Sequence, residues 1–389
     1  MQVGFKDTAG LAETPDIIVV GAGVIGLSAA WRLAQAGLCV SLVDPDPGRG
    51  SSWVAAGMLA PVSEAHYGEE EMVEILVRAA AGWPAFAGAL LEEVGCDVGY
   101  RPCGTVVVAA DASDRAALDD LIGLPERLGL DVRRLSGRAC RYAVPALAPG
   151  VRGGAEMPDD HQVDNRRLVE ALLAAVGGAS VFLHREAARS LELGADGSVS
   201  GVTLVGGDTI AAPRVLLATG ARAGSFEGVP DGVLPAVRPV KGHLLRLRGP
   251  VDPPLLSRTV RGLVHGRSCY LVPRRDGTLV VGATEEERGF DDRVQAGPVH
   301  DLLHDARTLV PGIDELVLEE SIAGLRPGSP DNRPYLGWTS VPGLAVASGH
   351  YRNGVLLAPL TADAVVHLVL SGSLPGELGS LDAQRRALA

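Results

Sequence analysis

Hydrophobic and polar positions between residues 16 and 44 follow a strand, helix, strand pattern. Ile17–Val20 is a short apolar run of β-branched residues, which is typical of a strand buried on both faces. Residues 27–36 have helical spacing, and Gly37 marks the end of that helix. A second apolar strand at 38–43 ends at Asp44. The order predicts a βαβ unit at the start of the fold.

The turn between the first strand and the helix reads Gly21-Ala22-Gly23-Val24-Ile25-Gly26. Glycines at these three positions allow a tight turn, a close backbone approach to a pyrophosphate and close helix–strand packing. Phosphates are favoured at a helix N-terminus by free N–H groups and the helix dipole. Asp44 follows Gly26 by 18 residues, where an acid can bind the ribose hydroxyls. We therefore expect FAD or NAD rather than NADP; a glycine-rich turn without a nucleotide is the alternative.

The same patterns predict further elements along the chain, without an internal repeat. The expected helices are 70–94 with a break at Gly82 and Pro84, 113–129, 164–176, 298–309 and 355–370. The expected strands are 104–110, 181–183, 187–193 paired with 199–204 as a hairpin, 215–220, 240–247, 269–273, 278–283 and 344–348.

A chain of 389 residues is long for one core and suits two domains. We expect an α/β fold in which a Rossmann-like cofactor domain is interleaved with an α+β substrate domain on a mixed or antiparallel sheet. The expected cofactor domain comprises 16–81, 150–230 and 318–371, and the substrate domain 82–149 and 231–317. Residues 1–15 are expected to be a flexible tail and 372–389 a polar tail.

Composition narrows the classes of partner. The net charge of −12 argues against nucleic acid or an anionic membrane surface. No signal-peptide core is visible at 1–15, and no apolar run approaches the roughly 18 residues of a membrane span. Five cysteines at irregular spacings, without a C-x-x-C pair, indicate reduced core thiols and a cytoplasmic protein.

Three segments carry candidate chemistry. Small residues at 53–61 suit a backbone that lies against a flat ligand, and a plain loop is the alternative. Residues 349–355 lead into the last long helix, so bare N–H groups there could stabilise a reduced flavin; a strand-to-helix turn without a ligand is the alternative. Arg326, in Gly-Leu-Arg-Pro-Gly, could bind a carboxylate by two parallel hydrogen bonds, although an isolated arginine is more often a surface charge.

The histidines, by contrast, give no sign of a metal site. We interpret His66, His184 and His265 as surface or structural residues, and no cluster of histidine, cysteine and carboxylate has the spacing of a metal site. Tyr270 lies in an alternating strand and by itself reads as a core tyrosine.

Five blocks in order resemble the glycine oxidases of the thiamine pathway, within the D-amino-acid oxidase family of FAD-dependent flavoproteins. The blocks are Ala55–Pro61, Pro239–Gly242, Cys269–Arg274, Gly324–Gly328 and Gly349–Pro359, and the resemblance runs from about 16 to about 370. It departs at two positions. Asp44 stands where the family usually has Glu, and the shorter side chain should still reach the ribose. Ser268 stands where a relative has His, so the rim of the substrate pocket differs.

The resemblance implies oxidation of glycine by O2 through FAD, giving an imine that supplies the thiazole ring of thiamine, and hydrogen peroxide. A sarcosine or D-amino-acid oxidase or dehydrogenase of the same fold is the alternative. Also implied are a homotetramer, a thiazole synthase as partner, and substrate binding by Arg326, Tyr270 and Arg352. Expected FAD contacts are Gly21, Gly23, Val24, Ile25, Gly26, Asp44, Ser51, Ser52, Ala56, Gly57, Met58, Ala187, His350, Tyr351, Arg352, Asn353, Gly354, Val355 and Leu356.

Hydride transfer from a neutral amine to flavin needs no strong side-chain base, so no catalytic acid or base is expected. Some relatives attach their flavin through a cysteine in the C-terminal part. No cysteine follows Cys269 in this chain, and we therefore expect FAD to be bound non-covalently.

Overall fold

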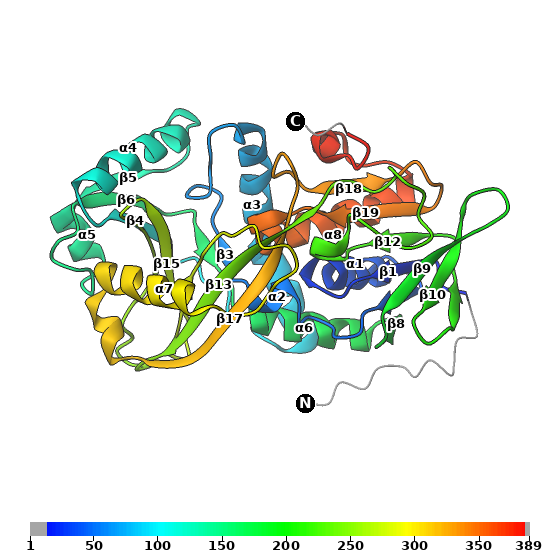
Figure 1. The fold of residues 1–389 in the computed structure, drawn as a ribbon, viewed down its shortest axis with the longest axis horizontal. Coiled ribbons are helices and arrows are strands. Elements are labelled where there is room, and N and C mark those ends of the chain that lie inside the picture. Colours follow the sequence, from blue (N-terminus) through cyan, green and yellow to red (C-terminus); the bar gives the residue numbers. More distant parts are fainter. Residues whose placement is uncertain (1–13, 386–389) are drawn as a thin grey trace.

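The computed structural model describes residues 14–385, and its strands form two main sheets that lie side by side along the long axis (Figure 1). Nearly all of the tail expected at 1–15 is outside the described residues. The six-stranded sheet is parallel except for its β18–β19 pair. In sheet order its strands are β18 (Tyr335–Trp338), β19 (Leu344–Ser348), β12 (Val215–Leu217), β1 (Ile17–Val20), β2 (Val40–Val43) and β8 (Val181–His184).

Helices α1 (Val24–Gln35), α6 (Asn165–Gly178) and α8 (Gly354–Ser371) bury their apolar side chains against this sheet. The other face carries a three-stranded sheet of β9 (Ala188–Leu193), β10 (Val199–Leu204) and β11 (Thr209–Ala211). β9 and β10 pair antiparallel, which confirms the predicted hairpin. The expected Rossmann-like unit is therefore present.

The eight-stranded sheet is mixed, as expected for the substrate domain. In sheet order its strands are β17 (Val317–Gly328), β13 (Arg238–Arg248), β16 (Thr278–Gly282), β15 (Arg267–Pro273), β14 (Thr259–Val264), β4 (Thr105–Ala109), β6 (Gly153–Met157) and β5 (Arg133–Ser136). Only β14 and β4 pair in parallel. Helices α4 (Ala112–Arg127), α5 (Gly137–Ala143) and α7 (Ala296–Leu309) pack on it.

Two segments differ from the domain boundaries expected from sequence. β6 and β17 belong to the eight-stranded sheet, whereas 150–157 and 318–328 were assigned to the cofactor domain. β17 pairs with β13 along its whole length. Pro327, which follows Arg326, is accommodated because β17 is an edge strand, where proline need not donate a hydrogen bond.

The break predicted within residues 70–94 is wrong, because α3 (Glu70–Val94) is one continuous helix. A proline inside a helix costs about 3 kcal/mol. Burial of Trp83, Phe86 and Leu90 offsets that cost, at roughly 1.5–3 kcal/mol per large apolar side chain. Trp83 also donates from Nε1 to the Leu356 carbonyl in α8 (2.9 Å), so the boundary expected at 81/82 falls inside a helix that packs with the cofactor domain.

Smaller differences occur at the ends of two elements. The first helix begins at Val24, one turn before the expected residue 27, directly after the glycine turn. The expected polar tail is partly structured: residues 376–381 form a 3-10 helix that buries Leu378 and Leu381.

Helix α3 and the helical stretch Tyr351–Ser371 are long and apolar enough to cross a membrane by length and composition alone. Both contribute to the core, where α8 packs against α1 and α3. We interpret them as core helices.

Candidate active site

A cavity of about 850 Å³ lies between the two sheets and receives residues from both. One end is formed by the glycine turn and Asp44, and the other by Tyr270 on β15 and Arg326 on β17. Between the two ends lie residues 54–58 and the start of the final helical stretch at 350–355. The predicted nucleotide and substrate residues therefore share one cavity.

The nucleotide end is built by close backbone contacts. Gly21 has φ +101°, and a Cβ on Gly26 would collide with the Gly21 carbonyl, so both positions require glycine. Asp44 accepts hydrogen bonds from the amides of Ala22 (2.7 Å) and Asp46 (2.8 Å), which tie it to the turn. The cap residue of α1 is a glycine without a side-chain hydrogen bond, which leaves the first-turn amides after Val24 open to a phosphate, whereas the Val24 amide itself is bonded to Ser52.

The middle of the cavity is lined by a segment that has little regular structure of its own. Residues 51–54 form the short helix α2 (Ser51–Val54), and Gly57 adopts φ +67°. Ser52 Oγ accepts from the Val24 amide (2.8 Å), and Ser51 donates from Oγ to the Leu325 carbonyl next to Arg326. This segment therefore joins the nucleotide end to the substrate end.

The start of the final helical stretch lines the same cavity. Residues 350–355 all line it, through a 3-10 turn at Tyr351–Asn353 and the first turn of α8. His350 is buried, with Nε2 3.1 Å from Thr361 Oγ1, and burial lowers its pKa to about 3. His350 is therefore neutral at physiological pH and adds no charge beside the cavity.

These features fit an FAD. The cavity joins a βα glycine turn to a second helix start, and glycines occur where a Cβ would meet backbone, as at Gly57 against the Val163 carbonyl. Of the expected cofactor contacts, all but two line the cavity. Gly26 packs under the turn, and Leu356 is buried in the core with its carbonyl bound to Trp83.

The substrate end is formed by side chains that lie flat on glycines. Arg326 donates from Nη1 to the Thr284 carbonyl (3.1 Å), and a Cβ on Gly242 would lie 2.5 Å from Nη2 and 2.6 Å from Cζ of Arg326. A Cβ on Gly282 would likewise lie 2.5 Å from Cζ of Tyr270. Burial raises the pKa of Tyr270, so its hydroxyl keeps its proton and can donate.

Arg352, expected to bind substrate, is held by two carboxylates. Its Nε lies 2.9 Å from Glu64 Oε2, and its Nη2 pairs with Glu69. Glu64 also pairs with Arg261 on β14. Burial would raise the pKa of Glu64, but Arg261, a hydrogen bond with His66 and Arg352 together bring it well below its usual range. Arg352 therefore lines the cavity as part of a neutralised network.

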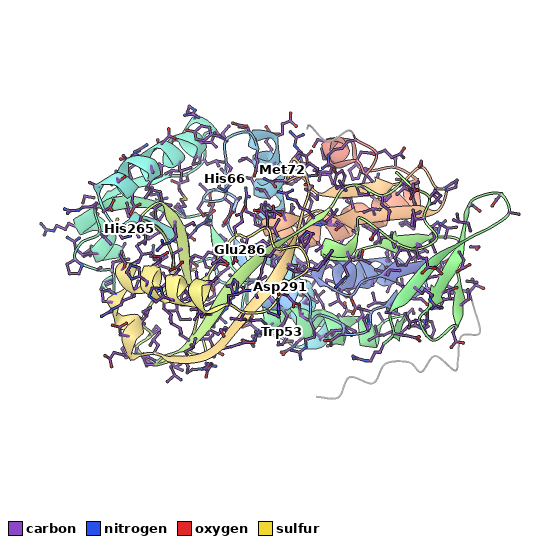
Figure 2. The ribbon with its side chains drawn as sticks, in the orientation of Figure 1. Trp53, His66, Met72, His265, Glu286 and Asp291 are labelled. Atoms are coloured by element: carbon purple, nitrogen blue, oxygen red, sulfur yellow. The ribbon has the colours of Figure 1, made fainter. Side chains whose placement is uncertain are left out.

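Several lining residues were not recognised from sequence. Glu64, Arg261 and His66 line the cavity. Glu64 follows the 55–61 block by three residues, which was the available signal, whereas Arg261 occurs in a strand that was not predicted. Figure 2 shows His66 in the middle of the molecule, between the two halves, and His265 at the outer end of one half.

The remaining histidines agree with a structural interpretation. His184 is buried with Nε2 3.3 Å from Ser41 Oγ, and His265 is exposed. Within residues 14–385 no group of three or more histidine, cysteine or acidic side chains is arranged to hold a metal.

The Pro239–Gly242 block also has a structural explanation. Lys241 is fully buried and donates from Nζ to the Arg293 carbonyl (2.5 Å) and to Gln295 Oε1 (2.8 Å). His243 Nδ1 lies 2.9 Å from Glu286 Oε1, and its Nε2 accepts from the Gln295 amide (3.1 Å). These bonds fix residues 283–295, some of which line the cavity, and Figure 2 shows Glu286 near the centre of the molecule.

Comparison with known proteins agrees with this architecture. The crystal structure of glycine oxidase from Geobacillus kaustophilus superposes with a TM-score of 0.87 at 34% identity, covering 96% of this chain and 100% of that one. In sequence, the chain is 36% identical over 357 residues to the glycine oxidase of that organism, covering 91% of this chain and 92% of the relative.

The bifunctional protein ThiO/ThiG of Nostoc sp. is 34% identical over 357 residues, which cover 92% of this chain and 53% of the relative. The chain thus spans about half the length of the bifunctional relatives it matches. A profile of the family described as FAD dependent oxidoreductase matches residues 16–368. The resemblance inferred from the five sequence blocks is confirmed, and the chain belongs to the FAD dependent oxidoreductase family.

Proposed function

We propose that this protein oxidises glycine, or an amino acid of similar size, with O2 to the imine and hydrogen peroxide. The observation that carries the proposal is that Arg326 and Tyr270 both line one end of the cavity, beside the segments suited to a flavin ring. Relatives named glycine oxidase cover nearly the whole chain and support the same activity.

Arg326 supplies the grip on the substrate carboxylate. Within residues 14–385, its one hydrogen bond runs from Nη1 to the Thr284 carbonyl, which leaves the other donors for a ligand. A guanidinium binds a carboxylate by two parallel hydrogen bonds, and the Tyr270 hydroxyl adds a further donor from a strand of the same sheet. Fixing the carboxylate orients the Cα–H bond of the substrate, which is the main contribution of the protein to the rate.

FAD, when bound, supplies the two-electron acceptor that receives hydride from the amino-acid carbon and passes the electrons to O2. The residues that would hold it are the glycine turn, Asp44, the 51–58 segment and residues 350–355. His350 is neutral and Glu64 and Arg352 pair with each other, whereas Arg326 lines the cavity without an ion-pair partner among residues 14–385. No side chain in this arrangement needs to act as a strong base.

We further propose that the imine is supplied to the thiazole ring of thiamine, in the cytoplasm, with a thiazole synthase as partner. The relatives named ThiO/ThiG support this proposal, because in them the part similar to this chain is fused to a second part. A homotetramer, the assembly expected from the family resemblance, is proposed on that resemblance alone.

The decisive experiment is the visible spectrum of purified protein before and after glycine is added without air. Bleaching of the flavin bands would establish cofactor, reaction and substrate together. A peroxide assay with glycine, sarcosine, D-alanine and D-proline would then rank the substrates, and a flavoprotein that none of the four reduces would contradict the proposal.

A further inference from the structure

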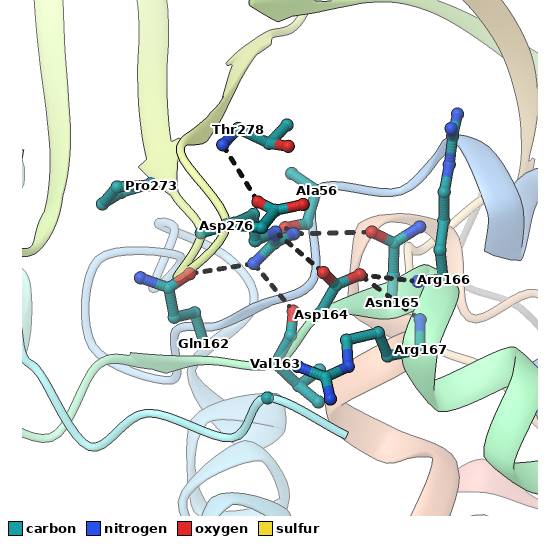
Figure 3. Close-up of polar contacts among 12 residues, drawn as sticks. Ala56, Gln162, Val163, Asp164, Asn165, Arg166, Arg167, Pro273, Asp276 and Thr278 are labelled. Carbon is teal, nitrogen blue, oxygen red and sulfur yellow. Dashed lines mark hydrogen bonds and ion pairs between the residues drawn. The ribbon is translucent and has the colours of Figure 1, made fainter. Parts of the chain in front are cut away.

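Arg274, the last residue of the Cys269–Arg274 block, has no part in the function described above, yet it is almost fully buried between the two halves. Its Nη1 donates to Gln162 Oε1 (2.8 Å) and the Val163 carbonyl (2.9 Å). Its Nη2 donates to the Ala56 carbonyl and lies 3.4 Å from Asn165 Oδ1. Figure 3 shows these partners converging from separate segments of the chain.

The carbonyls of the 51–58 segment are held by side chains from outside it. Asn165 donates from Nδ2 to the carbonyls of Ser52 (2.9 Å) and Trp53 (2.9 Å). Arg274 holds the Ala56 carbonyl, and a Cβ on the next residue, Gly57, would lie 3.2 Å from Nη2 of Arg274. The position of this cavity-lining segment therefore depends on Arg274 and Asn165.

Arg274 also follows Tyr270 by four residues, directly after the end of β15, and its amide donates to the carbonyl of Thr278, the first residue of the neighbouring strand β16 (2.7 Å). One end of Arg274 is thus anchored in the sheet that carries the substrate site. The other end is bonded to the wall of the cofactor cavity. Burial lowers the pKa of Arg274 to about 10, so the guanidinium is still charged at neutral pH.

We propose that Arg274 is a positioning residue that holds the 51–58 segment against the FAD ring, at a set distance from the substrate sheet. A lysine cannot replace it, because a single ammonium cannot span two pairs of acceptors as a planar guanidinium does. The inference rests on the binding of FAD in the cavity. The proposed oxidation of glycine is needed only where the test measures kcat and KM.

The test compares Arg274→Lys with Arg275→Lys, a matched control at an exposed arginine whose partner is Asp97. Apoprotein is titrated with FAD to obtain the dissociation constant, and the visible spectrum of the bound flavin is recorded with and without acetate, a carboxylate without an amine. Values of kcat and KM for glycine are measured at saturating FAD.

For Arg274→Lys we expect at least a tenfold weaker FAD affinity, a shift of the flavin bands and at least a tenfold lower kcat. The acetate affinity and KM should stay within about threefold, because Arg326 is anchored separately on Thr284. Arg275→Lys should match the wild type. The proposal is overturned if the flavin-loaded Arg274→Lys protein has the FAD affinity, flavin spectrum and kcat of the wild type. It is also overturned if the substitution lowers the melting temperature and changes none of these three quantities.

If Arg274→Lys does not fold, Asn165→Asp decides. It keeps an oxygen toward Arg274 but removes the Asn165 bonds to the Ser52 and Trp53 carbonyls, leaving Trp53 only its bond from Arg166 Nε (3.3 Å). We expect a three- to tenfold weaker FAD affinity with a spectral shift, and wild-type values overturn the proposal. If wild-type protein binds FAD but does not oxidise glycine, the proposed function fails while the FAD affinity and spectrum still test Arg274.

Discussion

Gly242→Ala is the sharpest test of where the substrate carboxylate binds. The new Cβ would lie 2.5 Å from Nη2 and 2.6 Å from Cζ of Arg326. Comfortable contacts between such atoms are about 3.5–4.0 Å, so the guanidinium must retreat by roughly 1 Å. The clash involves the end of a flexible side chain, and we therefore expect the fold to tolerate the substitution while Arg326 loses its position.

The magnitude follows from the hydrogen bonds that Arg326 would lose. A hydrogen bond to a charged group contributes about 1.5–3 kcal/mol, which corresponds to a roughly 10- to 150-fold decrease in kcat/KM for glycine. The acetate dissociation constant, read from the flavin spectrum, should increase over the same range. The affinity for FAD should not change, because Arg326 lies at the substrate end of the cavity.

Two glycine substitutions provide controls. Gly324 is paired with Gly242 across the β13–β17 ladder. A Cβ on Gly324 would lie 3.0 Å from Val54 in the 51–58 segment. Gly324→Ala should therefore alter the flavin spectrum more than the acetate affinity. Gly297→Ala in α7 points into open space and should match the wild type. If flavin-loaded Gly242→Ala protein keeps kcat/KM within twofold of wild type, Arg326 does not bind the carboxylate.

Three further predictions follow. Arg326→Lys should keep FAD but decrease kcat/KM about 100-fold or more, because an ammonium cannot make two parallel hydrogen bonds to a carboxylate; unchanged steady-state kinetics would contradict this. Burial lowers the pKa of His350 to about 3, below the 6.5 of an unfolded histidine, so the unfolded state takes up the proton first as pH falls. The free energy of unfolding, measured in urea, should therefore decrease from pH 6.5 toward pH 3, by about 2 kcal/mol at pH 5. His350→Gln should flatten this pH dependence, whereas the control His265→Gln, at an exposed site, should leave it unchanged. Heat or acid should release all of the flavin into the supernatant, because Cys269, the last cysteine, is buried and burial raises its pKa; flavin that stays on the precipitated chain would show a covalent bond.

Local sequence pattern was sufficient for the nucleotide half of the site. The strand, glycine turn, helix and acid at 17–44 are neighbours in sequence, so their contacts depend on short-range geometry. Most of the cofactor contacts that the family resemblance implied also line the cavity. Gly26 and Leu356 do not line the cavity, since Gly26 packs beneath the turn and Leu356 packs in the core. A sequence motif does not distinguish such packing from contact with a ligand.

Elements whose stability comes from distant partners could not be predicted in this way. Pro84 indicates a break when α3 is considered alone, but the burial of Trp83 and Phe86 keeps the helix continuous. β17 was not predicted from the sequence, and the proline after Arg326 is accepted there because β17 is an edge strand of its sheet. Both errors arise where long-range packing outweighs local propensity.

By itself, the sequence determined the βαβ unit, the class of cofactor and the order of the five blocks that resemble the family. Only the tertiary structure decided which charges remain available for a ligand. Arg352 and Arg326 look alike in sequence, yet Glu64 and Glu69 pair with Arg352, whereas Arg326 keeps free donors in the cavity. The physical reason is that a charge acts through its neighbours in space, and these neighbours come from segments more than 200 residues apart.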